Sequence, residues 1–302
     1  MKRFYGLLIV LLILTGCSFL LPKLVKIEPE QVAIVVNPKP KMSKVKFDKF
    51  DTTTQFLLVY NTKTKEYYGR QENVKPESLA SLVKVLVAYL VVKDYESGNL
   101  KPTDSMNFED WDSDGHDAVG NTTQEALHHM LYSSSNSATN LLIDKIGGFE
   151  VATQKLRKYG FNDSTIECFV DPSQVSMKCE GVNHSTLLDM TKAFEYLSTT
   201  DNEFTRLAQK PMRETIYNYS HTARIMNKGG INSLVIGNIS LVEVDGDKYI
   251  ISTIHSDPGS ADQYDDFTEI NEVRNNIDPN SKKDPISKIT QEVVNELKNS
   301  RI

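Results

Sequence analysis

The pattern of apolar and polar positions indicates a leader, a polar connecting stretch and a folded domain. Residues 7–14 form an unbroken apolar run behind a basic Lys-Arg pair. Because the run is too short for a mature membrane-spanning helix, it predicts a signal peptide over residues 1–16. Residues 17–51 are rich in Pro and Lys and predict a tether. The compact pattern that follows predicts a single domain over residues 52–302.

Strand-like runs stand at both ends of this domain, with helical patterns between them. The strand-like runs are paired as two hairpins, 55–61 with 66–70 and 234–244 with 248–255. Helices are predicted over 81–93, from the Thr122/Glu125 capping box through Tyr132, over 138–146, up to Gly160, and along the apolar stripe 286–297. This order predicts an α+β fold in which a helical region is inserted into an antiparallel sheet.

Charge and composition limit the classes of partner. The chain has 34 Lys and Arg against 40 Asp and Glu. Loss of the leader removes two positive charges, so the mature net charge is about −8, which argues against binding to nucleic acid. The six histidines lack a Cys or Glu partner at metal-ligand spacing, so no metal and no cofactor is expected.

Cys17 follows Leu-Thr-Gly at the end of the leader. This sequence resembles the bacterial lipoprotein processing box, in which the cysteine receives the lipid. The resemblance implies an exported protein anchored to the outer face of the bacterial cell membrane. The alternative is an ordinary signal peptide followed by an incidental cysteine.

The candidate chemistry begins at Ser81 and Lys84, which are three residues apart at the start of an apolar helix. A serine hydroxyl needs a base to become a good nucleophile, and a lysine in a dry cleft beside other cations can have its pKa lowered enough to serve. Taken alone, Ser-x-x-Lys is common, and such a lysine more often extends to the surface.

Two further motifs change this interpretation. Ser134-Ser135-Asn136 follows the capped helix, and Lys228-Gly229-Gly230 lies on a strand before the last hairpin. With Ser-x-x-Lys, these resemble the motif set of class A β-lactamases and penicillin-binding proteins, in the same order and at similar separations. The resemblance covers roughly residues 52–300. It implies a five-stranded antiparallel sheet with helices on both faces and an inserted all-helical subdomain.

The resemblance also implies a role for each residue. Ser81 would be acylated, Lys84 would be its base or proton relay, and Ser134 would pass the proton to the leaving nitrogen. Lys228 would line the cleft. Substrate would be bound by Asn136, Gly229 and Gly230, and the backbone N–H groups of Ser81 and Ile231 would form an oxyanion hole.

The sequence departs from the family pattern in three places. Ser135 replaces an aspartate that is largely structural. Gly229 replaces a hydroxyl residue that binds the substrate carboxylate, a loss of about 1.5–3 kcal/mol; Arg224 is a candidate replacement cation. In the Ω loop, Asp171 is the nearest match to the deacylating glutamate, with Glu167 as a second candidate and Val175 in place of an asparagine. These changes predict slow deacylation.

Two cysteines flank this altered loop. In the family an Arg–Asp ion pair closes the neck of the loop, and Cys168 and Cys179 lie near those two positions. The resemblance therefore predicts a Cys168–Cys179 disulfide. The alternative is two buried free thiols.

The leading hypothesis is a monomeric serine acyl-enzyme hydrolase that acts on β-lactams or D-Ala-type cell-wall peptides. A degenerate binding or sensor lipoprotein is the second hypothesis, and a related esterase or amidase is the third. The complete set of Ser81, Lys84, Ser134 and Lys228 favours an enzyme. The changes at Gly229, Asp171 and Val175 favour degeneration.

Overall fold

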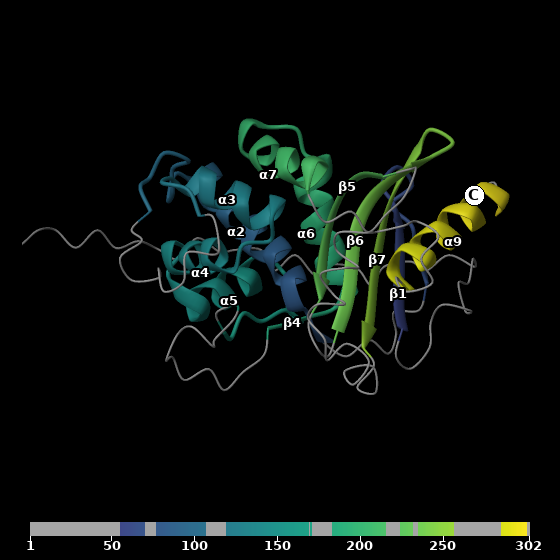
Figure 1. Ribbon diagram of the computed structural model, residues 1–302, viewed down its shortest axis with the longest axis horizontal. Coiled ribbons are helices and arrows are strands. Elements are labelled where there is room, and N and C mark those ends of the chain that lie inside the picture. Colours follow the sequence, from purple (N-terminus) through teal and green to yellow (C-terminus); the bar gives the residue numbers. More distant parts are fainter. Residues whose placement is uncertain are drawn as a thin grey trace, which may run out of the picture. The chain divides into compact units, whose positions relative to one another are not determined.

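A five-stranded antiparallel sheet organises the protein (Figure 1). The computed structural model describes residues 55–69, 77–106, 119–168, 170, 183–215, 224–231, 235–256 and 285–300, all within the unit Pro38–Ile302. The strands are β1 (Gln55–Asn61), β2 (Tyr67–Gly69), β5 (Arg224–Ile231), β6 (Val235–Val244) and β7 (Asp247–Ser256). Their order is β2-β1-β7-β6-β5, which leaves β5 at one edge.

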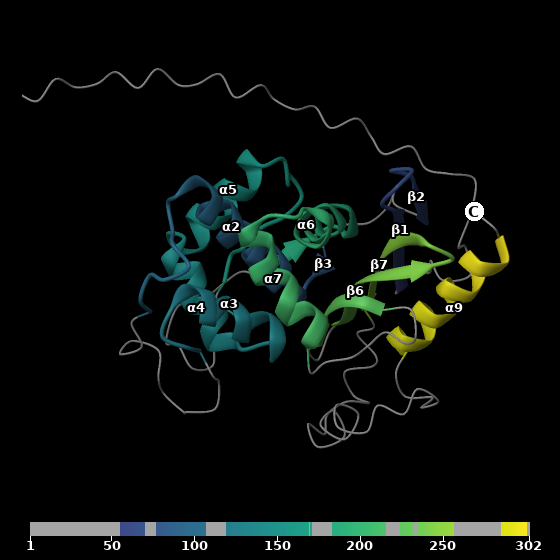
Figure 2. The same cartoon turned by 90° about the horizontal axis from the view of Figure 1, so that it is seen from above.

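Helices cover both faces of this sheet (Figures 1 and 2). Most of the described helical residues lie between β2 and β5 in the sequence. The elements there are η1 (Ala80–Leu82), α2 (Val83–Ser97), α3 (Thr123–Tyr132), α4 (Asn136–Lys145), α5 (Gly148–Lys158), α6 (Leu187–Thr199) and α7 (Glu203–Glu214). A two-stranded sheet joins β3 (Glu77–Ser78) to β4 (His184–Ser185). The last helix, α9 (Pro285–Ser300), lies on the other face of the large sheet.

Strand alternation produces two separate apolar cores. On β6, Ile239 and Leu241 face the helical block, whereas Val242 and Val244 pack with Val293 of α9. Helix α2 is apolar on nearly every side and is surrounded by other elements, as is expected for a central helix. Polar side chains on α2 such as Lys84 and Asp94 are therefore buried, and they need hydrogen-bond partners inside the protein.

The sequence predicted most of these elements correctly. Both hairpins form, α3 begins with the Thr122/Glu125 capping box, and α9 follows the apolar stripe. The fold class is confirmed: it is α+β, with an antiparallel sheet and an inserted helical region. Helix α7, which begins with a capping box at Asn202, was not predicted.

The predicted signal peptide, Cys17 and the tether lie outside the described residues, so they stay predictions. Among the helices that are described, none combines the length and apolar character needed to cross a bilayer.

Candidate active site

Ser81 lies in the 3-10 turn η1, directly before the buried helix α2. The preceding residue, Ala80, has a φ of 44°, in the left-handed region that non-glycine residues seldom adopt. Lys84 follows one turn later, and its Nζ lies 2.9 Å from the Ser81 Oγ. The strained turn and the start of the helix thus place the Ser81 hydroxyl beside an amine.

The Lys84 side chain is fully buried, with 0% of its surface exposed. Its Nζ lies within hydrogen-bonding distance of four oxygen atoms: Ser81 Oγ (2.9 Å), the Ser134 carbonyl (2.6 Å), Ser134 Oγ (3.0 Å) and Asn136 Oδ1 (2.7 Å). An ammonium has only three N–H groups. The site therefore provides acceptors for every proton that Lys84 carries, and it keeps both serine hydroxyls within reach of one nitrogen.

Ser134 stands between two lysines. Its Oγ lies 3.0 Å from the Lys84 Nζ and 2.9 Å from the Lys228 Nζ. Its φ is 60°, a second left-handed non-glycine residue at the site. Lys228 is 1% exposed, and its Nζ also donates to the Gly229 carbonyl at 2.5 Å. A continuous hydrogen-bonded path therefore runs from Ser81 through Lys84 and Ser134 to Lys228.

Helix α4 carries Asn136 at its first position, where its side chain faces Lys84. Ser135 is the N-cap, and its Oγ accepts from the Ala138 N–H at 3.0 Å. A serine hydroxyl and an aspartate carboxylate both satisfy an N-cap. The replacement of aspartate by Ser135 is therefore compatible with the local structure.

Strand β5 approaches the turn that carries Ser81 closely at Gly230. A Cβ at this position would lie 2.7 Å from the Leu82 nitrogen and 3.0 Å from the Ser81 nitrogen. Glycine is needed here because any side chain would displace the turn that carries Ser81. The predicted oxyanion-hole donors, Ser81 and Ile231, thus belong to segments that are in contact at Gly230.

Arg224, the candidate replacement for the missing third-motif hydroxyl, begins strand β5. It pairs with Val242, whose side chain packs on the α9 side of the sheet, and its guanidinium donates to Asn227 Oδ1 at 2.7 Å. Because neighbouring strand residues face opposite ways, Asn227 points away from the side that Lys228 faces. Burial lowers the pKa of Arg224. The suggestion that Arg224 supplies a cation in place of the missing hydroxyl stays a prediction.

In the described part of the Ω region, Val170 is fixed beside the site by Asn140. Asn140 Oδ1 accepts from the Val170 N–H at 2.7 Å, and Asn140 Nδ2 donates to the Val170 carbonyl at 2.8 Å. Asn140 is one helical turn after Asn136, so the two amides lie on one face of α4. Neither Asn140 nor Val170 was predicted as a site residue, although the four-residue spacing between Asn136 and Asn140 was a usable signal in the sequence.

The other Ω-loop candidates have different outcomes. Asp171 and Val175 lie outside the described residues. Glu167 is exposed, and its backbone N–H donates to Asn183 Oδ1 at 3.0 Å. Cys168, the next residue, is buried, and its backbone N–H also donates to Asn183 Oδ1, at 3.1 Å. Cys179 lies outside the described residues, so the predicted disulfide stays a prediction.

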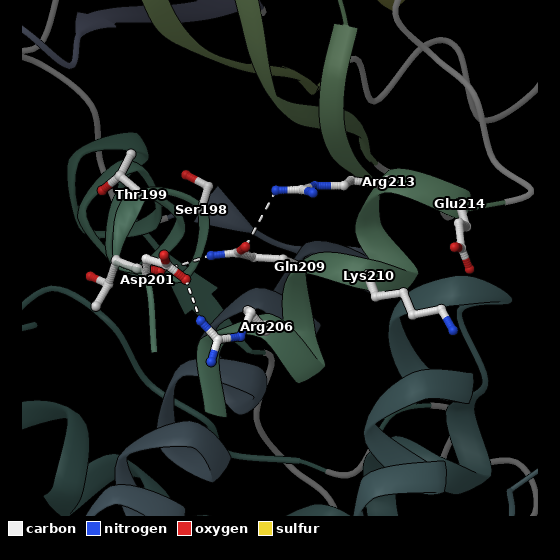
Figure 3. Close-up of a pocket in the computed structure, with 9 residues that line it drawn as sticks. Ser198, Thr199, Asp201, Arg206, Gln209, Lys210, Arg213 and Glu214 are labelled. Carbon is white, nitrogen blue, oxygen red and sulfur yellow. Dashed lines mark hydrogen bonds and ion pairs between the residues drawn. The ribbon is translucent and has the colours of Figure 1, made fainter. Parts of the chain in front are cut away.

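A separate pocket of about 600 Å³ lies between the end of α6 and α7 (Figure 3). It is lined by residues of polar type: Ser198, Thr199, Thr200, Asp201, Arg206, Gln209, Lys210, Arg213 and Glu214. Arg206 pairs with Asp201 at 2.6 Å, and Gln209 Nε2 donates to the Thr200 carbonyl at 2.8 Å. None of the predicted site residues lines this pocket.

The fold is that of class A β-lactamases and a related penicillin-binding protein. An acyl-enzyme complex of a PBP-A mutant with penicillin G matches with a TM-score of 0.62 and 17% identity, over 82% of this chain and 90% of that chain. A β-lactamase from Burkholderia vietnamiensis matches with a TM-score of 0.61 and 15% identity, over 80% and 91%. One from Xanthomonas campestris matches with a TM-score of 0.58 and 17% identity, over 68% and 84%.

The chain belongs to the β-lactamase enzyme family, whose sequence model matches residues 38–297. No curated protein is significantly similar to it in sequence. Family membership, together with the matching folds, places it in the superfamily of serine β-lactamases and penicillin-binding proteins.

Proposed function

We propose that the protein is a serine acyl-enzyme hydrolase that acts on β-lactams or D-Ala-type cell-wall peptides and deacylates slowly. The observation that carries the proposal is the hydrogen-bonded path from Ser81 through Lys84 and Ser134 to Lys228. Such a path links a nucleophile, a base and a proton donor without any large movement.

In the acylation step the Ser81 Oγ attacks the substrate carbonyl carbon while its proton passes to the Lys84 Nζ. Backbone N–H groups of Ser81 and Ile231 stabilise the developing oxyanion, at about 3 kcal/mol for each donor. As the C–N bond breaks, Ser134 gives its proton to the leaving nitrogen and recovers one from Lys84. Lys228 holds the Ser134 Oγ in position at 2.9 Å.

The deacylation step lacks an evident base at the loop position beside α4. Val170 has no group that could take a proton from water, and its side chain packs against the main core. Hydrolysis of the acyl-enzyme should therefore be slow, which favours a penicillin-binding or weak β-lactamase character.

A lipid on Cys17 would hold this domain at the outer face of the cell membrane, with residues 17–51 as the tether. The substrate would then be a cell-wall peptide or an incoming antibiotic. The negative net charge of the mature chain gives no reason to expect a nucleic-acid partner.

The second candidate is a binding or sensor protein that keeps the fold but does not turn over. It is favoured by Gly229, which offers no hydroxyl to a substrate carboxylate, and by Val170.

Burst kinetics with a chromogenic cephalosporin separate these functions. The proposal predicts release of about one equivalent of product per protein, followed by a slow steady rate. Rapid linear turnover would contradict slow deacylation, and the absence of both burst and turnover would favour the binding protein.

A further inference from the structure

Ser134 lies in a short connection between two helices, α3, which ends at Tyr132, and α4, whose N-cap is Ser135. Its φ of 60° is in the left-handed region, where a residue with a side chain is strained. Such a conformation persists only where the surrounding structure imposes it. The contacts that hold this connection therefore decide where the Ser134 hydroxyl lies.

Three of these contacts are local and end on one oxygen atom. The His129 carbonyl accepts from the Ser133 N–H at 3.1 Å, from the Ser133 Oγ at 3.0 Å and from the Ser135 N–H at 3.2 Å. These bonds fold the connection back onto the last turn of α3. None of the three involves the carbonyl of Tyr132, which belongs to the last turn of the helix and needs a donor from elsewhere.

The donor to the Tyr132 carbonyl comes from a distant part of the chain. Thr215 Oγ1 donates to it at 2.9 Å, from a position 83 residues further along. Thr215 is the C-cap of α7 and is 7% exposed. Because the peptide group is planar, this bond fixes the orientation of the whole unit between Tyr132 and Ser133. It thereby sets the direction in which the chain enters Ser134.

The position of the Ser134 hydroxyl leaves little room for error. Its Oγ lies 3.0 Å from the Lys84 Nζ and 2.9 Å from the Lys228 Nζ. Both lysines are buried, one on α2 and one on β5, so neither can follow a displaced hydroxyl without repacking of the core. A displacement of about 1 Å can cost a catalytic group about 10²-fold in rate.

We propose that Thr215 is a positioning residue for Ser134. Its hydroxyl holds the Tyr132 carbonyl and so keeps the Ser134 Oγ where it can pass its proton to the leaving nitrogen and recover one from Lys84. Thr215 acts through the backbone and exchanges no proton itself. The inference rests on the proposed acylation of Ser81 and adds a residue outside the three sequence motifs.

Two substitutions at Thr215 test the role of its hydroxyl. Thr215→Val keeps the shape of the side chain but leaves the Tyr132 carbonyl without this donor, whereas Thr215→Ser keeps the donor. The second-order rate of Ser81 acylation by benzylpenicillin would be measured by intact-protein mass spectrometry. We expect Thr215→Val to react about ten times more slowly than the wild type, as for a small displacement of Ser134. Thr215→Ser should react nearly as fast as the wild type.

Thr205→Val is the matched control on the same helix. Thr205 is fully buried, and its Oγ1 donates to the Thr200 carbonyl at 2.8 Å, at the other end of α7. Urea unfolding should show a loss of stability in both Thr205→Val and Thr215→Val, because each loses a buried hydrogen bond. Only Thr215→Val should slow acylation.

A Ser134→Ala background separates positioning of Ser134 from a general disturbance of the site. In that background no hydroxyl remains to be positioned, so Thr215→Val should slow acylation no further. The slower reaction would be followed over hours at high penicillin concentration.

The outcomes distinguish this inference from the proposed function. An unchanged rate in Thr215→Val, an equal loss in Thr215→Ser or Thr205→Val, or an undiminished effect of Thr215→Val in Ser134→Ala overturns the inference but leaves the acyl-enzyme standing. A wild type that benzylpenicillin does not acylate overturns both.

Discussion

Asn140 binds both the N–H and the carbonyl of Val170, at 2.7 Å and 2.8 Å, one helical turn away from the asparagine that contacts Lys84. The two bonds fix the Val170 backbone beside the site. The residue that is held there is apolar and packs on the core. Position 170 therefore gives a more direct reason to expect slow deacylation than the neighbouring Asp171, which the sequence had suggested as a base.

Val170→Glu should shorten the lifetime of the acyl-enzyme. A carboxylate at this fixed position could act as a general base for water, a contribution of about 10²–10⁴-fold in favourable geometry. We expect at least a tenfold faster loss of the penicillin adduct, followed by mass spectrometry after free antibiotic is removed. Val170→Gln is the matched control, because it has the same length without the charge. Equal lifetimes in Val170→Glu and the wild type would show that position 170 does not limit deacylation.

Lys84→Met should slow the acylation of Ser81 by about 10²–10⁴-fold, the usual contribution of general acid–base catalysis. The substitution keeps an unbranched side chain in the buried helix but removes the nitrogen that touches Ser81, Ser134 and Asn136. Stopped-flow measurement with a chromogenic cephalosporin gives the rate. Lys145→Met, at an exposed lysine on α4, should react like the wild type. An unchanged rate in Lys84→Met would remove Lys84 from the mechanism.

The sequence predicted the motif residues because each motif is contiguous and lies on a recognisable element. Ser81 and Lys84 share one helical turn, and Lys228 lies on a strand with a clear hairpin after it. What the sequence did not predict depends on contacts between distant segments. The Asn140–Val170 pair joins residues 30 apart, and the face on which Arg224 lies depends on the register of β5 with β6.

The left-handed φ values of Ala80 and Ser134 were equally inaccessible from the sequence. Neither residue type favours that conformation, so only the surrounding packing imposes it. Helix α7 was missed although Asn202 and Thr205 form a capping box there.

Asp189 predicts a specific dependence of stability on pH. Its carboxylate is 2% exposed and accepts from the Asp163 N–H and from Ser164 Oγ, which ties the segment before the Ω loop to α6. Burial raises the pKa of Asp189, although Lys192 and Ser164 lower it in part. The folded state therefore binds this proton more tightly than the unfolded state, so the contribution of Asp189 is full below the unfolded pKa of about 3.9 and falls as the pH rises through the folded pKa.

Urea unfolding of the wild type and Asp189→Asn between pH 3 and pH 8 measures this contribution. The free energy of unfolding of the wild type relative to the variant should decrease as the pH rises and then level off. A relative stability that is constant or increases with pH would contradict the assignment.

The Cys168–Cys179 disulfide should stabilise the domain by roughly 3 kcal/mol in the chain-entropy model. Alkylation of the unreduced, denatured protein, followed by intact-mass measurement, should leave both cysteines unmodified until a reductant is added. Reduction, or the double change Cys168→Ser and Cys179→Ser, should lower the midpoint of urea unfolding. Alkylation of both thiols without reductant would show that the bond is absent.

The proposed function requires that Ser81 forms a covalent acyl-enzyme. Intact-protein mass spectrometry of the domain after brief mixing with benzylpenicillin tests it most directly, with Ser81→Ala as the control. We expect the wild type to gain the mass of one antibiotic, in an adduct that persists for minutes and maps to the peptide that contains Ser81. We expect no increase on the variant. An unmodified wild type that also leaves the antibiotic intact, or an adduct that survives in Ser81→Ala, would contradict it.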